Sequence, residues 1–277
     1  MMIRSLLITL SLALLASGAR ADQVADEFTV GVVPQFETRR LHRVWRPILD
    51  HIERQTGYRL KLVGSPTIPA FESEFLVGEF DFAYMNPYHV MLASEAQDYR
   101  PLVRDVGKSL HGVLVVRKGG NIHSVEDLDG KIMAFPAPNA LGASLQMRQE
   151  LVDRFGLNFR ARYVKTHDSV YLNVLLGEAD AGGGVQKTLA SQKPAIRNNL
   201  EVIHTTTPVA PHPFTVHPRI PSEKAEKVQR ALLQLGDTAE GQALLSKVPI
   251  SKIGVASMAD YMPLRELKLE RFYVKDN

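Results

Sequence analysis

Residues 81–93, DFAYMNPYHVMLA, join a short apolar strand to a helix through an Asn-Pro pair. The strand is rich in aromatic side chains, and Pro87 suits the first turn of a helix. Tyr84, Asn86 and Tyr88 lie at or just after this junction. Because ligands of open α/β sheets bind at the carboxyl ends of strands, we expect these three residues to border a binding site. The alternative is that Tyr84 belongs to the core and Asn86 only caps the helix.

The same alternation of strand and helix continues on both sides of this stretch. Short apolar runs typical of buried strands lie at 28–34, 58–64, 79–85, 111–120, 131–135 and 161–166. Apolar residues at helical spacing lie at 39–55, 70–77, 141–155, 170–176, 224–235 and 258–267. Apolar strands alternating with helices predict the α/β class, with parallel sheets covered by helices on both faces.

Two such α/β units are joined by β-rich crossovers near residues 108–116 and 202–210, and the last helices return to the first unit. This order predicts a two-lobed fold with two hinge crossovers and a cleft between the lobes. We place lobe 1 at residues 22–108 plus 207–277 and lobe 2 at residues 109–206.

Residues 1–21, MMIRSLLITLSLALLASGARA, have the pattern of a signal peptide. The apolar run is too short for a membrane span and ends in Ala19-Arg20-Ala21, so we expect export to the periplasm with cleavage after Ala21. The chain has no Cys, and a core must therefore stabilise it. The 33 Lys and Arg residues, less Arg4 and Arg20, balance 30 Asp and Glu residues to a formal net charge of +1. This balance argues against a nucleic-acid partner.

Three segments together resemble the periplasmic phosphonate/phosphate-type solute-binding proteins of ABC transporters. They are EFDFAYMNPY (79–88), HGVLVVRKGGNIHSVEDLDGKIMAF (111–135) and HDSVYLNVLLGEADAGGGV (167–185). The resemblance spans about residues 28–235. It implies a two-lobed protein of the "flytrap" type that binds a small oxyanion without a cofactor and delivers it to a membrane permease, and we expect a monomer.

FPAPNALGAS, residues 135–144, is the matching turn of the second lobe. Asn139 stands where a helix cap is expected, and the small residues Ala140 and Gly142 leave the helix N-terminus open. We expect the backbone N–H groups of 139–143, including that of Leu141, to bind an anion, with Ser144 nearby. In the phosphonate-binding relatives this turn usually carries hydroxyl residues, which Ala140 and Leu141 replace here. A plain capped helix is the alternative.

Two further turns of the second lobe are candidates. His167 and Ser169 lie at a strand-to-helix turn, where His167 would bring a pH-sensitive positive charge and Asp168 or Ser169 would cap the helix. A surface histidine is the alternative.

Three glycines at 182–184 are costly in a strand unless something approaches the backbone closely. We expect Gly183 and Gly184 to admit the ligand or to permit lobe closure.

The remaining candidates lie in lobe 1. Phe36 and Thr38 belong to the loop after the first strand, and His212 follows the second crossover in PHPFTVHP, residues 211–218. Both segments are expected near the cleft, although the prolines also suit a rigid return of the chain.

Other functional classes fit the sequence less well. No G-x-S-x-G motif or paired-carboxylate pattern indicates an enzyme, and no H-x-x-x-H or H-E-x-x-H spacing indicates a metal site. A cage of Tyr84, Tyr88, Phe36 and Phe214 for a quaternary amine remains open, as does a sensing subunit that signals to a histidine kinase. The missing hydroxyls near residue 140 favour a simple oxyanion, such as phosphate or phosphite, over an aminophosphonate.

Overall fold

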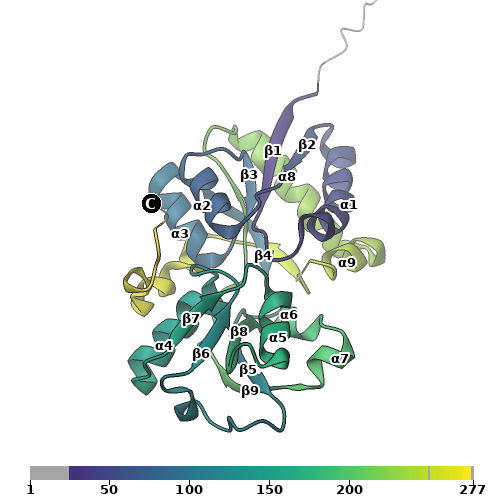
Figure 1. Ribbon diagram of the computed structural model, residues 1–277. Helices are drawn as coiled ribbons and strands as arrows, with labels where there is room; N and C mark the ends of the chain where they lie inside the picture. Colours follow the sequence, from purple (N-terminus) through teal and green to yellow (C-terminus); the bar gives the residue numbers. More distant parts are fainter. Residues whose placement is uncertain (1–24, 249, 276–277) are drawn as a thin grey trace, which may run out of the picture.

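Two separate β-sheets, each flanked by helices, form the upper and lower lobes in Figure 1. The computed structural model describes residues 25–248 and 250–275. The expected signal peptide, residues 1–21, lies outside the described residues. Alternating strands and helices build both lobes, which confirms the predicted α/β class.

Lobe 1 contains a six-stranded sheet in the order β11-β4-β10-β3-β1-β2. Its strands are β1 (Glu27–Val32), β2 (Arg59–Val63), β3 (Phe82–Tyr84), β4 (Arg100–Asp105), β10 (Phe214–Val216) and β11 (Ile253–Val255). Its helices are α1 (Thr38–Thr56), α2 (Ile68–Leu76), α3 (Pro87–Gln97), α8 (Ser222–Gln234) and α9 (Ala239–Leu245). Helices α2 and α3 lie on one side of the sheet, and α1 and α8 pack together on the other (Figure 1).

Lobe 2 contains a five-stranded sheet in the order β7-β6-β8-β5-β9. Its strands are β5 (Gly112–Arg117), β6 (Ile132–Phe135), β7 (Arg160–Tyr163), β8 (Ala181–Val185) and β9 (Leu200–Thr205). Its helices are α4 (Gln146–Phe155), α5 (His167–Leu176), α6 (Gln186–Ala190) and α7 (Pro194–Arg197), with a 3-10 turn η1 (Glu126–Leu128) and a π-helical turn η2 (Leu141–Leu145). Two apolar clusters cover the two faces of this sheet, one under α4 and one under α5.

Local sequence signals explain where several helices begin and end. Gly57 adopts a left-handed conformation with φ of 73° and ends α1, as its position in the sequence predicts. Thr67 and Asn86 cap α2 and α3 by accepting hydrogen bonds from Ala70 N and His89 N. The predicted helix at 258–267 is instead a series of 3-10 turns, η4 (Met258–Asp260) and η5 (Met262–Leu267), followed by η6 (Leu269–Arg271); a further 3-10 turn, η3 (Leu235–Asp237), extends α8.

The expectation of parallel sheets is wrong, because both sheets are mixed. In lobe 1, β1 pairs in parallel with β2 and β3, whereas β10 runs antiparallel to β3 and β4. In lobe 2, β6 pairs in parallel with β7 and β8, whereas β5 runs antiparallel to β8 and β9. The strand that follows each crossover, β5 in lobe 2 and β10 in lobe 1, runs against the βα units, whereas β4 and β9, which precede the crossovers, run parallel to them.

The chain passes between the lobes after β4 and again before β10. The connections lie between Asp105 and Gly112 and between Thr205 and Phe214, and an isolated bridge joins Leu110 to Val209 between them. The predicted lobe boundaries at 108–109 and 206–207 lie within these connections and stay a prediction.

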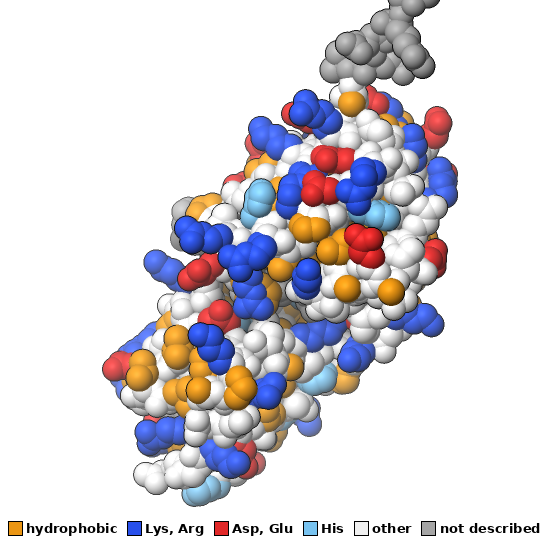
Figure 2. Space-filling view, turned by 90° about the vertical axis from the view of Figure 1, so that its right-hand side faces the viewer, with side chains coloured by type: hydrophobic (Ala, Val, Ile, Leu, Met, Phe, Trp, Pro, Cys, Tyr) orange, Lys and Arg blue, Asp and Glu red, His pale blue; other side chains and the backbone are white. Residues whose placement is uncertain are grey.

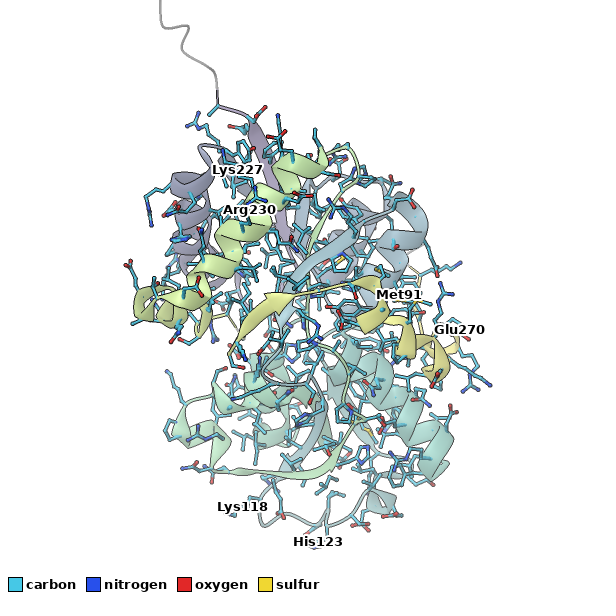
Figure 3. The ribbon with its side chains drawn as sticks, turned by 180° about the vertical axis from the view of Figure 1, so that it is seen from behind. Met91, Lys118, His123, Lys227, Arg230 and Glu270 are labelled. Atoms are coloured by element: carbon cyan, nitrogen blue, oxygen red, sulfur yellow. The ribbon has the colours of Figure 1, made fainter. Side chains whose placement is uncertain are left out.

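The C-terminal segment runs behind the molecule from β11 to a place beside α3. Figure 3 shows it from behind, with Glu270 near Met91 of α3. No helix in the described part of the chain is both long enough and apolar enough to cross a bilayer.

Candidate functional site

Two adjoining cavities lie between the lobes. The inner cavity has a volume of about 20 Å³, room for one or two water molecules. The larger cavity has a volume of about 550 Å³ and opens toward α1, α6 and α9. Gln35, Leu110, Val185 and His212 line both, so the two cavities are continuous.

The start of the helix after β6 forms the lobe 2 wall of the inner cavity. Ala140, Leu141, Gly142 and Ala143 line it. The chain enters the helix through the π-helical turn, in which the amides of Ser144 and Leu145 both donate to Ala140 O, at 2.7 and 3.1 Å. The first N–H groups of a helix have no partner within it, and together with the helix dipole they favour a bound anion. The expected helix N-terminus therefore lies at the cleft.

Residues of lobe 2 itself closely approach the glycines of β8, where we expected the ligand or the opposite lobe. The expected role of Gly183 and Gly184 in ligand entry or lobe closure stays a prediction. A Cβ atom on Gly183 would lie 1.9 Å from Ala143 O, and one on Gly184 would lie 2.1 Å from the Tyr171 hydroxyl. These neighbours belong to lobe 2 itself. The close approach is thus the packing of the π-helical turn and of α5 onto the central strand of their own sheet.

Tyr84 and Asn86 form part of the opposite wall, in lobe 1. Asn86 lines the inner cavity, and its Oδ1 caps α3 as predicted. Its Nδ2 donates to Asn139 O across the lobe boundary, at 3.2 Å. Tyr84 lines the larger cavity and is only 3% exposed, with its ring 4.7 Å from that of Trp45. Its hydroxyl has no hydrogen-bond partner among the residues that the structure describes.

Burial and the charge of Asp105 raise the pKa of the Tyr84 phenol far above its ordinary value. The hydroxyl therefore stays protonated and is a donor beside the cavity. Tyr84 is thus both a core residue and a cavity wall, two roles that we expected to exclude each other.

Two histidines face the inner cavity as neutral groups. Burial lowers the pKa of His167 to about 4. Burial, followed by the nearby His89, Lys187 and His167, lowers the pKa of His212 to about 3. The positive charge that we expected from His167 is therefore missing at neutral pH. Gln35 Nε2 lies 2.9 Å from His212 Nε2, and because an amide NH₂ only donates, this ring nitrogen is the acceptor.

Several predicted residues lie away from the two cavities. Tyr88 lies outside the two cavities, in a separate hollow of lobe 1 that Met91 and Glu270 also line; Figure 3 labels these last two residues. Phe214 is buried in the lobe 1 core against Phe82, so the four rings of the expected quaternary-amine cage are not brought together. Phe36 does line the larger cavity, whereas Thr38 begins α1 on the exposed surface.

The helix caps of lobe 2 also differ from expectation. The cap of α5 is Thr166, whose Oγ1 accepts from Ser169 N at 3.1 Å, so neither Asp168 nor Ser169 has this role. Ser144 is fully buried and accepts a hydrogen bond from Arg148.

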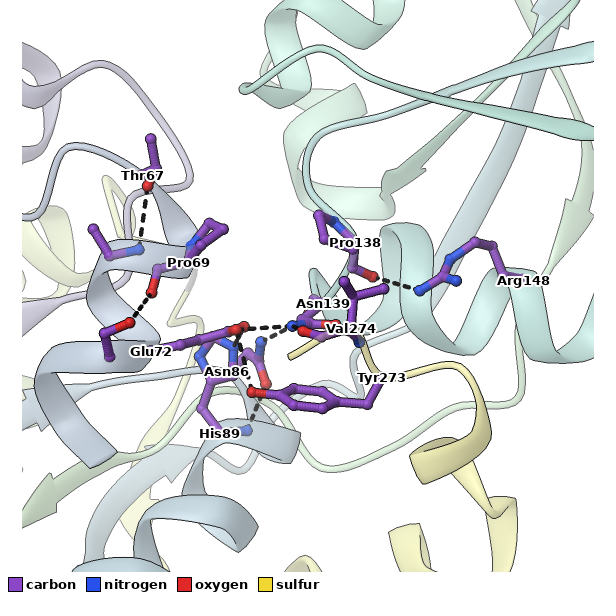
Figure 4. A network of polar contacts seen from close by, with 12 residues as sticks. Thr67, Pro69, Glu72, Asn86, His89, Pro138, Asn139, Arg148, Tyr273 and Val274 are labelled. Atoms are coloured by element: carbon purple, nitrogen blue, oxygen red, sulfur yellow. Dashed lines mark hydrogen bonds and ion pairs between the residues drawn. The ribbon is translucent and has the colours of Figure 1, made fainter. Parts of the chain in front are cut away.

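Asn139 does not cap its helix because it is engaged in a network that links the lobes (Figure 4). Its Nδ2 donates to Glu72 Oε2 at 2.8 Å and to Val274 O at 2.7 Å, and its Oδ1 accepts from Val274 N at 2.9 Å. Glu72 belongs to α2 and lies 2.8 Å from His89, which is completely buried. Hydrogen bonds from lobe 1 and from the C-terminal segment therefore hold the turn that carries the helix N-terminus. Through these contacts the two lobes are closed on each other.

Basic residues around the larger cavity were missed in the sequence analysis. Lys187 of α6 pairs with Asp105 of β4 at 2.8 Å, and Arg40 of α1 lies 3.8 Å from Asp168 of α5. Both pairs join the two lobes. Lys187 comes two residues after the end of β8. The rule that ligands bind at strand ends, which pointed to Tyr84, could therefore have pointed to Lys187 as well. Arg40 left no such signal, because it lies in a helix whose pattern is that of a surface helix.

A metal centre finds no support in the geometry. In residues 25–248 and 250–275, no three His, Asp or Glu side chains are grouped so that they could hold a metal ion. Neutral amides and backbone N–H groups at the inner cavity, and the Tyr84 phenol at the larger one, are donors that suit an anion.

Comparison with known proteins assigns the fold. The family model described as the periplasmic substrate-binding protein of phosphonate ABC transporters matches residues 30–261. The phosphate-import protein PhnD of Mycolicibacterium smegmatis is 20% identical over 236 residues, which cover 77% of this chain and 73% of that protein.

Two solved structures are similar over nearly the whole chain. The binding-protein component of an ABC phosphonate transporter from Pseudomonas aeruginosa has a TM-score of 0.81 at 18% identity, covering 90% of this chain and 88% of its own. PhnD1 from Prochlorococcus marinus, in complex with methylphosphonate, has a TM-score of 0.79 at 16% identity, covering 90% and 99%. The predicted two-lobed periplasmic-binding-protein fold is confirmed.

Proposed function

Because the chain belongs to the family of periplasmic substrate-binding proteins of phosphonate ABC transporters, we propose that its interlobe cleft binds a phosphorus oxyanion. Phosphate, phosphite and phosphonates share the tetrahedral, negatively charged group that such a cleft takes. The protein closes on the anion and presents it to a membrane permease, without a chemical reaction and without a cofactor. We further propose that it is exported to the periplasm as a monomer, with cleavage after Ala21.

The observation that carries this proposal is the open helix N-terminus at Leu141, Gly142 and Ala143, which faces the inner cavity. Its N–H groups favour an anion, and the neutral amide of Asn86 lies across from it. Neutral donors hold an anion without a fixed ion pair, so the ligand can be released again to the permease. The inner cavity is smaller than a phosphonate group. The bound group therefore occupies the junction of the two cavities, beside Gln35 and His212.

A periplasmic subunit that signals to a sensor kinase is the second candidate, because a kinase would use the same closed pair of lobes. A quaternary amine is disfavoured by the basic residues that line the larger cavity, among them Arg40 and Lys187. Their charge repels a cation and attracts an anion.

The proposal is tested by isothermal titration calorimetry on residues 22–277 with phosphate, phosphite, methylphosphonate and sulfate. The same titrations are made with the Gln35→Glu variant. This variant keeps the shape of the side chain but adds a negative charge where both cavities meet. Like charges about 4 Å apart cost about 4 kcal/mol at an effective dielectric constant near 20, so the affinity for an oxyanion should fall at least about 100-fold.

The matched control is Gln229→Glu, the same chemical change on α8, where Gln229 Nε2 donates to Leu102 O outside the two cavities. It should bind like the original protein. If none of the phosphorus anions binds, or if both variants bind them equally well, the proposed site is refuted. Binding of sulfate alone would move the ligand to another class of oxyanion.

A further inference from the structure

The larger cavity has a wall that is basic and hydroxyl-rich. Arg40, Lys108, Lys187 and Lys247 line it, and among the described residues of its wall there is no Asp or Glu. These four side chains come from α1, from the connection after β4, from α6 and from the segment after α9. Figure 2 shows this side of the molecule, where a hollow separates the two lobes and Lys and Arg side chains border it.

Two of these cations are already compensated and two are not. Lys187 is paired with Asp105, and the guanidinium of Arg40 lies near Asp168 and 3.8 Å from the centroid of the Phe36 ring. By contrast, Lys108 and Lys247 have no carboxylate within 4 Å among the residues that the structure describes. The exposed Lys108 and Lys247 therefore add positive charge at the edge of the cavity, and Lys108 also lines a neighbouring hollow that contains Asp260 and Glu266.

The sizes of the two cavities indicate that an organic substituent on the bound anion would lie in the larger cavity. The inner cavity accepts only the oxygens of an anion, and Gln35, Leu110, Val185 and His212 connect it with the larger one. A substituent on the anion therefore projects into a space of about 550 Å³, which is ordinary for a small organic ligand.

We propose that the ligand is an organophosphonate or phosphate monoester whose organic substituent carries a second acidic group, and that Lys108 and Lys247 select this group. The proposal rests on the proposed function and names the ligand class within it. Both lysines are exposed, so salt screens their attraction and each contributes a modest factor. The same charges disfavour an ammonium group, which makes aminoalkylphosphonates poor ligands.

The test compares ligands that share one head group and differ in the charge of the tail. Calorimetry at pH 7.5 and low salt would use methylphosphonate, 2-aminoethylphosphonate and 3-phosphonopropionate. We expect 3-phosphonopropionate to bind at least about 10-fold more tightly than methylphosphonate, and 2-aminoethylphosphonate to bind more weakly than both. The advantage of the carboxylate should shrink in 0.5 M NaCl, a salt concentration chosen to shorten the Debye length to about 4 Å.

Lys108→Gln with Lys247→Gln should reduce the preference for the carboxylate about 10-fold and weaken methylphosphonate binding by a clearly smaller factor. The control is Lys118→Gln with Lys227→Gln, two exposed lysines that lie at the far end of lobe 2 and on α8 (Figure 3). It removes the same charge away from the cleft and should change neither affinity.

The possible outcomes separate this inference from the proposed function. Equal affinity for methylphosphonate and 3-phosphonopropionate, or a preference for the amine, overturns the acidic-substituent proposal while oxyanion binding stands. A preference that persists in the lysine variant also overturns it. Failure of all three phosphonates here, together with failure of phosphate and phosphite in the titrations proposed above, refutes the proposed function itself.

Discussion

Replacing Gly183 by Ala should destabilise the protein strongly even when no ligand is present. Gly183 lies in the central strand β8, and its backbone conformation suits any residue, so only the new methyl group matters. That Cβ atom would lie 1.9 Å from Ala143 O and 2.6 Å from the Phe135 ring. Since ordinary contacts begin near 3.4 Å, the turn must move by about 1.5 Å, the difference between 3.4 and 1.9 Å.

The magnitude follows from the kind of atom that is displaced. Overpacking of a core costs typically 1–3 kcal/mol, and the neighbour here is backbone that cannot rotate away, so we expect about 3 kcal/mol. A domain of this size loses roughly 2–4 °C of melting temperature per kcal/mol, which gives a decrease of about 6–12 °C. The assay is urea and thermal unfolding of the ligand-free protein, followed by circular dichroism.

Gly64→Ala is the matched control. Gly64 is exposed, and its new Cβ would meet only the Thr38 methyl group at 3.6 Å, so its free energy of unfolding should stay within about 0.5 kcal/mol of the original. If Gly183→Ala were as stable as Gly64→Ala and lost only ligand affinity, the glycine would serve the ligand or the closure of the lobes. That result would refute the packing argument.

Two further predictions concern the polar groups of the cleft. Tyr84→Phe removes a hydroxyl without a protein partner, so the ligand-free melting temperature should change by less than about 2 °C while oxyanion affinity falls about 10-fold or more, as calorimetry would measure; unchanged affinity would exclude this hydroxyl from the site. His167 and His212 have folded-state pKa values of about 4 and 3, below the ordinary value of 6.5, so the unfolded chain binds protons first as the pH falls. Their contribution to stability is complete above pH 6.5 and should decrease by up to about 2 kcal/mol for each histidine between pH 6.5 and 5, as urea unfolding would show. The variant with both histidines replaced by Gln should have a flatter pH dependence, and an equally steep one would show that the two histidines are not its source.

Much of the fold could be predicted from local patterns. The apolar run before Asn86 and the helical spacing after it identified β3 and α3, and Gly57 marked the end of α1. The mixed direction of the strands could not be predicted in this way. It depends on where each crossover strand inserts, which is decided by contacts between distant segments.

The candidate site was predicted unevenly for the same reason. The strand-end rule correctly led to the segments that border the cleft, but it could not tell Tyr84, whose side chain lines the larger cavity, from Tyr88, which points to the outer side of α3. The protonation of His167 likewise depends on its burial by neighbours from other parts of the fold.

The sequence by itself determined the class of the fold, the order of its elements and the position of the helix start near Ala140. Hydrophobic periodicity and helix capping depend on residues that are close in the chain, so they can be recognised in the sequence. The tertiary structure alone decided that the glycines of β8 pack against the π-helical turn and α5 of their own lobe. It alone also decided that Arg40, Lys108, Lys187 and Lys247 line one cavity. Coulomb attraction and close packing depend on distances in space, and residues that far apart in the chain carry no local sign that the fold will bring them together.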